Sequence, residues 1–342
     1  MIRRFLKMIP ALLVAGTVFV ACNTNKTEEN KPEYIVGAYL WHQYPMDAPI
    51  EADCFTHLNY AFGNVNDSLN GVDILSPDFF KRVVALKDTF PHLKVLISIG
   101  GGNNSKFSNM AADSLNRLAF AADINRIITE YGIDGVDFDW EIPGNKFGIP
   151  EDTINFVKMI RDVRAAIGPD KLLSIAGGGE LGGVDAPKVL EYVDYFNAMT
   201  YDLSWPPGHH TAMHRSPLVG WRSIDETLAD YYAKSVPKEK IVMGLAFYGR
   251  GDGERFPGWY NYGFIQPEYD DLTHEWDSIA MVPYLANKEG NLVLSYDNPK
   301  SIAIKCDFIK EQGFKGGMYW RYACDDSVGT LRHVVAKSLL NK

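Results

Sequence analysis

The sequence predicts one α/β domain folded as a (β/α)8 TIM barrel. Eight short apolar runs, rich in β-branched and aromatic residues, recur along the 342-residue chain. Most intervals between them hold a helical pattern, and several of these patterns end at Gly or Pro. Strand followed by helix, repeated eight times with right-handed crossovers, closes a parallel barrel. The alternative is an open doubly wound sheet, but no glycine-rich phosphate loop joins the first strand to its helix.

The expected strands are short, and each is apolar enough to be buried on at least one face. In chain order they lie at residues 34–40, 56–62, 94–100, 134–140, 171–177, 193–199, 240–247 and 316–320. The clearest helical patterns lie at residues 76–90, 114–132, 153–168, 224–236, 301–313 and 328–340. Between the seventh and eighth strands, residues 251–298 provide 48 positions, which predicts a short or absent insertion there.

The N-terminus carries an export signal. Residues 1–7 are basic, and residues 8–21 form an apolar run that is too short to span a membrane comfortably. The run resembles a bacterial lipoprotein signal, with Ala21 before a lipidated Cys22, although Phe19 stands where Leu is usual; an ordinary secretory signal is the alternative. We therefore expect a signal peptide at 1–21, a flexible tether at 22–32 and the catalytic barrel at 33–342. The protein would be extracytoplasmic and lipid-anchored to a bacterial membrane, with the cell surface as one location.

Composition restricts the partners. With 34 Lys and Arg against 43 Asp and Glu, the net charge is −9, so we expect no nucleic acid and no membrane contact except through a lipid on Cys22. Cys54, Cys306 and Cys324 are widely spaced and odd in number, which favours buried free thiols over a disulfide framework. We expect no metal and no cofactor. The histidines of "GHH" at 208–210, with His214, fall in a Pro- and Gly-rich stretch that predicts a loop rather than a metal site.

An acidic strand holds the candidate chemistry. In "DGVDFDWE" the carboxyl groups of Asp137, Asp139 and Glu141 recur every second residue, so they share one face of a strand. Neighbours on that face start about 7 Å apart, and in a low dielectric they cannot all be ionised. At least one should keep a proton at neutral pH, as a general acid must.

Two other interpretations of this strand are a solvated edge strand and a cation site. Val136, Phe138 and Trp140 fill the opposite face, which an edge strand would not need, and the flanking residues supply no calcium-type loop. Active sites of such barrels lie at the C-terminal ends of the strands, where Glu141 falls. Asp134 is out of phase and should stabilise the start of the strand.

Several motifs together resemble glycoside hydrolase family 18, the chitinases and endo-β-N-acetylglucosaminidases. The strand matches the family signature D-x-x-D-x-D-x-E from Asp134 to Glu141. "SIGG" at 98–101 matches S-x-G-G, and Met199, Tyr201 and Asp202 match M-x-Y-D. The similarity extends from Tyr34 to Tyr322 and includes these motifs in the family's order.

The resemblance implies retaining hydrolysis in which the 2-acetamido group of the substrate is the nucleophile. Glu141 would be the general acid, Asp139 would orient the acetamido N–H, Asp137 would share a proton with Asp139, and Tyr201 would donate to the acetamido carbonyl. Trp320 would be the floor of the −1 subsite. The other residues expected to line or support the pocket are Asp202, Met199, Tyr39, Phe62 and Ser98. Trp205 is either a stacking residue of a plus subsite or a loop-packing Trp.

The expected substrate is a polysaccharide or glycan that contains N-acetylglucosamine, bound by a monomer. The resemblance favours an endo-acting chitinase that cleaves β-1,4 bonds between these units in chitin or chito-oligosaccharides. An endo-β-N-acetylglucosaminidase acting on N-glycan cores is the alternative, because a short insertion leaves a shallow groove that could admit branches. A non-catalytic chitin-binding lectin on the same barrel is a third reading, disfavoured because Glu141, Asp139 and Tyr201 are all present.

Overall fold

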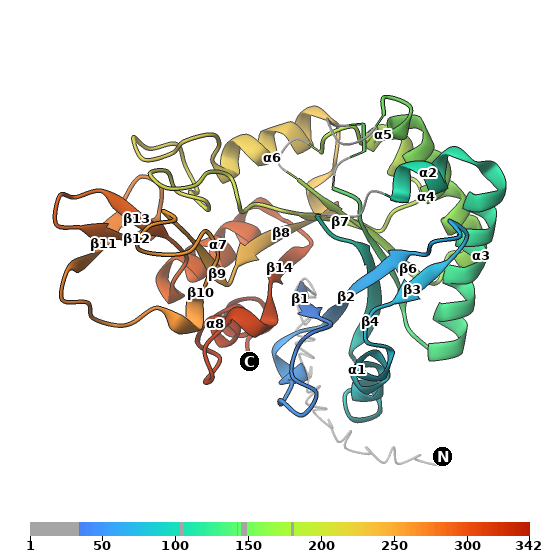
Figure 1. Ribbon diagram of the computed structural model, residues 1–342, viewed down its shortest axis with the longest axis horizontal. Helices are drawn as coiled ribbons and strands as arrows, with labels where there is room; N and C mark the ends of the chain where they lie inside the picture. Colours follow the sequence, from blue (N-terminus) through green and yellow to red (C-terminus); the bar gives the residue numbers. More distant parts are fainter. Residues whose placement is uncertain (1–33, 103–105, 142, 145–148, 179–180) are drawn as a thin grey trace, which may run out of the picture. The chain divides into compact units, whose positions relative to one another are not determined.

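A closed barrel of eight parallel strands forms the centre of the fold (Figure 1). The computed structural model describes residues 34–102, 106–141, 143–144, 149–178 and 181–342. Neighbouring strands pair in the order β1, β2, β4, β5, β6, β7, β8 and β14, and β14 pairs with β1 to close the ring. Their bounds are Ile35–Trp41, His57–Val65, Lys94–Gly100, Gly135–Asp139, Leu172–Gly177, Tyr195–Ala198, Ile241–Ala246 and Gly316–Trp320. The predicted TIM barrel is confirmed, with a strand in each predicted position.

Helices alternate with these strands, as the sequence pattern predicts. The six predicted helices are α1 (Pro77–Thr89), α3 (Ser114–Tyr131), α4 (Asp152–Ile167), α6 (Ile224–Ala233), α7 (Pro299–Gln312) and α8 (Thr330–Leu340). Local signals fix their ends. Asp113 caps α3 by accepting from two backbone N–H groups, and Gly132 ends it in the left-handed conformation. The short helices α2 (Lys106–Ala112) and α5 (Ala186–Val189) are additional to the prediction.

The chain between β8 and β14 forms a short insertion. It forms an antiparallel sheet of five strands, in the order β10, β9, β13, β12, β11, drawn in orange in Figure 1. The strand bounds are Tyr248–Gly251 (β9), Tyr260–Asn261 (β10), Leu272–Asp277 (β11), Val282–Asn287 (β12) and Leu292–Ser295 (β13). Phe256, Leu285, Val293, Leu294 and Tyr296 form its own small core. A further strand, β3 (Val72–Ile74), pairs antiparallel with β2.

The apolar side chains of the strands and the inward faces of the helices form one continuous core around the barrel. The three cysteines Cys54, Cys306 and Cys324 are free and buried, as predicted. Within the described ranges, no helix combines the length and apolar character needed to cross a membrane. Cys22, the signal peptide and the tether lie outside the described residues.

The end of β4 approaches β5 so closely that it requires glycine. Gly100 has φ +124°, and a Cβ added there would lie 2.2 Å from the carbonyl oxygen of Asp139. Gly101 has φ +93°, and its Cβ would lie 2.9 Å from the ring of Phe62. The S-x-G-G motif therefore has a steric reason: it lets the backbone of β4 pass beside the acidic strand and the ring of Phe62.

Replacing Gly100 with Ala should destabilise the barrel more than replacing Gly132, because both glycines have positive φ but only Gly100 is crowded. Gly132, with φ +65° and no atom within 4 Å of its added Cβ, is the matched control. We expect Gly132→Ala to cost about 1 kcal/mol. Gly100→Ala should cost at least about 2 kcal/mol more, because backbone must shift. Urea unfolding of the two variants measures the difference; equal losses would contradict the steric argument.

Candidate active site

Strand β5 places its acidic residues on the inner face of the barrel. Its other face is apolar: Val136, Phe138 and Trp140 are buried, and Trp140 stacks on Phe107 with ring centroids 5.0 Å apart. Because β5 lies between β4 and β6, it is not an edge strand. Asp134 lies at the start of the strand, where its carboxylate accepts from the Val95 N–H at 2.9 Å and forms an ion pair with Lys87. The out-of-phase acid therefore stabilises the start of β5.

Asp137 lies below the cavity and is held by four hydrogen bonds. One carboxylate oxygen accepts from the hydroxyls of Tyr39 at 2.8 Å and Ser98 at 2.7 Å. The other accepts from the Ser174 hydroxyl at 2.6 Å and the Asn197 amide at 3.0 Å. The strand register explains the two serines, since Ser98 and Ser174 are the direct partners of Asp137 on β4 and β6. Burial raises the pKa of Asp137, and these bonds oppose the increase.

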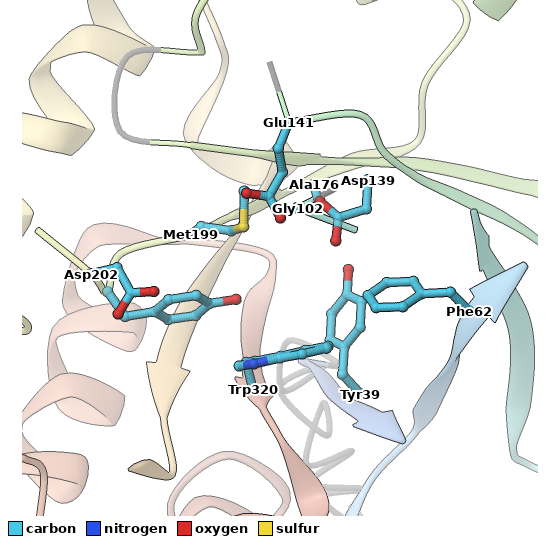
Figure 2. Close-up of a pocket in the computed structure, with 10 residues that line it drawn as sticks. Tyr39, Phe62, Gly102, Asp139, Glu141, Ala176, Met199, Asp202 and Trp320 are labelled. Carbon is cyan, nitrogen blue, oxygen red and sulfur yellow. The ribbon is translucent and has the colours of Figure 1, made fainter. Parts of the chain in front are cut away.

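Asp139 and Glu141 lie next to each other above Asp137, with both carboxyl groups facing the cavity (Figure 2). Two neighbouring buried carboxyl groups cannot both be ionised without large repulsion, so one of them keeps a proton. Burial raises the pKa of Asp139 well above its ordinary value, and the negative charges of Glu141 and Asp137 raise it further. Burial and the charge of Asp202 also raise the pKa of Glu141. The proton therefore belongs to the pair rather than to either residue.

The cavity at the C-terminal ends of the strands contains most of the residues predicted from the sequence (Figure 2). It is lined by Tyr39, Phe62, Gly102, Asp139, Glu141, Ala176, Met199, Tyr201, Asp202 and Trp320. Asp137 and Ser98 do not line it; they form the buried layer beneath it. Gly102 and Ala176 were not predicted. Small residues are also common in ordinary loops and strands, so their size alone does not identify them in the sequence as pocket residues.

Aromatic rings form the floor of the cavity. Trp320, the last residue of β14, is stacked at 27° to Phe62 and meets the Tyr39 ring edge-on, with both centroid distances 5.7 Å. Tyr201 also lines the cavity, and its hydroxyl is 4.0 Å from the Met318 sulfur. A flat indole face beside clustered carboxyl groups suits a sugar ring, whose C–H groups pack on aromatic faces while its polar groups bind acids.

Trp205 follows this site in the loop between β7 and α6. It is 53% exposed, and its ring lies 6.0 Å from that of Trp221, which is 63% exposed. The guanidinium of Arg250 lies 5.4 Å from the centre of the Trp205 ring. Exposure of both indoles favours a stacking surface over loop packing for Trp205.

Asp202 is the most strongly anchored acid of the cavity. Arg250 donates to both carboxylate oxygens, with its Nε 2.6 Å from Oδ1, and the Tyr248 hydroxyl donates to Oδ1 at 2.7 Å. Burial opposes ionisation of Asp202, but the contacts with His210 and Arg250 hold its pKa below the ordinary value. Sequence reasoning missed Arg250 and Tyr248. The strand predicted at residues 240–247 stops before both of them, and Tyr248–Gly251 begins the insertion as β9.

A second cluster of ligand-type side chains lies away from the cavity. Glu51, Cys54 and His333 bring one ligand atom each within 4.8 Å of one another. Glu51 is already engaged: Arg332 donates to both of its oxygens at 3.0 Å, and His333 lies 3.0 Å from one of them. A cation placed there would face the Arg332 guanidinium, so these residues do not fit a metal.

The comparisons with known proteins agree with this geometry. The family model for glycosyl hydrolases family 18 matches residues 28–325. The chain belongs to this family. An endochitinase of Manduca sexta is 27% identical over 83% of this chain, and the chain spans 60% of the length of that relative. Probable chitinase 2 of Drosophila melanogaster is 29% identical, over 92% of this chain and 73% of its own length. A solved family 18 N-acetylglucosaminidase from Paenibacillus barengoltzii superposes with a TM-score of 0.79 at 30% identity, covering 90% of this chain and all of the other.

Replacing Asp139 with Asn should stabilise this family 18 barrel at alkaline pH. A carboxyl whose pKa is raised on folding makes the native state bind more protons, so stability falls as pH rises through that pKa. Each unit of elevation corresponds to about 1.4 kcal/mol. Asn cannot ionise, so the gain in melting temperature over wild type should be larger at pH 8 than at pH 4.

The exposed Asp47 provides the control, because Asp47→Asn makes the same chemical substitution at a solvated carboxylate without touching the cavity. Thermal unfolding of the three proteins at both pH values makes the comparison. A gain for Asp139→Asn that is the same at pH 4 and pH 8 would rule out the raised pKa.

Proposed function

We propose that this protein is an endo-acting glycoside hydrolase that cleaves β-1,4 bonds between N-acetylglucosamine units by a retaining, substrate-assisted mechanism. The observation that supports this most is that the neighbouring carboxyl groups of Asp139 and Glu141 face the same cavity as the Trp320 indole. One proton shared by two carboxyls provides both an acid and a carboxylate, and the indole provides the surface that holds a sugar between them.

Glu141 is the general acid. Its carboxyl faces the cavity, and its raised pKa keeps the acid form available at higher pH than for an ordinary glutamate. It protonates the glycosidic oxygen as the bond to C1 breaks. The acetamido carbonyl oxygen of the −1 sugar attacks C1 and forms an oxazolinium ion. Glu141, now a carboxylate, then takes a proton from the water that opens this ion with net retention.

Asp139 and Tyr201 hold the acetamido group. The Oδ1 atom of Asp139 is buried and has no hydrogen-bond partner among the described residues, so it can accept from the acetamido N–H. The negative charge that Asp139 acquires when it passes its proton to Glu141 stabilises the oxazolinium cation. The Tyr201 hydroxyl, whose pKa burial raises well above its ordinary value, stays a donor for the acetamido oxygen.

The relatives support chitin over an N-glycan as substrate. The Manduca sexta and Drosophila melanogaster proteins are named as chitinases, and the first of them as an endochitinase. The exposed Trp205, which lies beside Arg250, and its neighbour Trp221 offer further stacking surface outside the cavity, as cleavage within a chain requires. An endo-β-N-acetylglucosaminidase that acts on N-glycan cores is the competing outcome of the experiment below.

Glu141→Gln should abolish turnover and leave sugar binding in place, because the amide keeps the shape but cannot donate the acid proton. We expect kcat on chitopentaose to fall by at least about a thousandfold, with a dissociation constant within a few-fold of wild type. Chitopentaose and a high-mannose glycoprotein are offered side by side, products are separated by mass, and binding is measured by calorimetry.

Each outcome of this experiment decides between the readings. Internal cleavage of chitopentaose by wild type alone supports the proposal. Cleavage of the glycoprotein only would assign the N-glycan activity. Binding without cleavage by wild type would identify a lectin. Full turnover by Glu141→Gln would remove Glu141 from its role as the acid.

We also propose that the chain is a lipoprotein anchored through Cys22. The basic segment, the apolar run and Ala21 before Cys22 support this, and the polar residues 23–32 suit a flexible tether. Cys22→Ala should release the protein from the membrane fraction of a bacterial host and remove incorporation of labelled palmitate. Cys54→Ala is the control, since a buried thiol should take no label. Unchanged labelling of Cys22→Ala would favour the ordinary secretory signal.

A further inference from the structure

Two neighbouring histidines are fully buried in the loop between β7 and α6. His209 and His210 both have 0% exposure, and no ring nitrogen of either has a hydrogen-bond partner among the residues that the structure describes. Their backbone is firmly placed: the His210 N–H donates to the Ser295 hydroxyl at 3.0 Å, and its carbonyl accepts from the Leu203 N–H at 3.1 Å. A buried imidazole with unpaired nitrogens is costly, which calls for a functional reason.

His210 faces the anchored acid of the cavity. Its Nδ1 atom lies 3.6 Å from Oδ1 of Asp202, just beyond hydrogen-bond length, so a small rotation of the ring closes the bond. The other groups around His210 are Tyr248, with ring centroids 5.2 Å apart, Arg250 and Asp297. Asp297 is neutralised by Lys305, whose Nζ lies 2.6 Å from both of its oxygens. Burial lowers the pKa of His210, although Asp202 opposes this, so the ring is neutral and has one N–H to donate.

Asp202 in turn acts on the catalytic pair. It lines the same cavity as Glu141, and its negative charge is the main electrostatic contribution to the raised pKa of Glu141. Arg250 and Tyr248 hold the carboxylate from β9. His210 lies near it in the β7–α6 loop, which also carries Asp202, so it is the only one of these three partners that lies outside β9. Losing it would leave the Asp202 carboxylate held from β9 alone.

We propose that His210 is a positioning residue: it holds the Asp202 carboxylate at the edge of the cavity and thereby sets the pH range in which Glu141 donates its proton. This inference rests on the proposed function. When the N–H donor is removed, the charge of Asp202 is less neutralised and acts more strongly on Glu141. The pKa of Glu141 then rises further, so activity persists to higher pH. The remaining charged or titratable groups around Glu141 and Asp202, namely Asp137, Asp139, Tyr201, Tyr248 and Arg250, are unchanged by this substitution.

The chain offers a matched control in His209. It has the same residue type and burial, but its Nε2 lies 3.4 Å from Asp277 on β11, and its ring lies beside Tyr284. The pH profile of kcat/KM on chitopentaose is measured for wild type, His210→Phe, His210→Gln and His209→Phe. We expect His210→Phe to move the alkaline limb upward by about half a pH unit. His210→Gln, which keeps an N–H donor, should restore the limb toward wild type, and His209→Phe should leave it in place.

Thermal unfolding of each variant separates positioning from folding. If His210→Phe does not fold, His210→Met removes the donor with a more adaptable side chain and replaces it in the comparison. An unmoved limb in a folded His210 variant that lacks the donor, or an equal shift in His209→Phe, would overturn the inference. Neither result affects the proposed function, which is tested separately by whether wild type cleaves chitopentaose internally and Glu141→Gln does not.

Discussion

The structure of the site depends on the repulsion between carboxyl groups placed on one face of a buried strand. Two unit charges about 7 Å apart repel by about 2 kcal/mol at an effective dielectric constant of 20. Asp137, Asp139 and Glu141 therefore cannot all be charged without help. Asp137 has four hydrogen-bond donors on β1, β4, β6 and β7, which favour its charged form. These donors meet only because the barrel closes, so the ring of strands is itself a requirement for the acidic layer.

That arrangement directs the proton to the top of the strand. Asp139 has a negative neighbour on each side, and Asp137 has all of its acceptor positions occupied, so the mobile proton is shared with Glu141. A carboxylic acid and a carboxylate thus lie together beside the floor formed by Trp320. The cost is instability at high pH, where the shared proton must leave. This is the usual conflict at a catalytic site, where charge placed for reaction weakens the fold.

The barrel and the acidic face could be predicted because both follow from periodic patterns over short stretches of the sequence. Strand β5 alternates strictly, so Asp137 and Asp139 fall on one face whatever the rest of the chain does, and Glu141 follows two residues after the strand ends. The sequence shows Gly100 and Gly101 as part of a motif, and the structure explains them by the close approach of β4 to β5. The supports of Asp202 could not be predicted in this way. Arg250 and Tyr248 lie in a strand of four residues, more than 40 residues after the acid that they hold. His210 is close to Asp202 in the sequence but lies in an irregular loop, so no period connects any of the three with this acid.

The strands of the insertion could not be predicted either, because their sequences do not show a clear alternation of apolar and polar residues. Strand β11 presents exposed or half-buried side chains along its whole length, so its residues do not alternate as a half-buried strand should. Its role follows from connectivity instead. Because β9 comes directly after β8, the first residues of the insertion enter the cavity region, and Arg250 neutralises Asp202 there. Removing one partner of such a pair leaves an uncompensated buried charge, which costs far more than the pair contributes. The insertion is therefore part of the catalytic electrostatics: a barrel without it would retain Asp139 and Glu141 but lose the counter-ion that keeps Asp202 charged beside them.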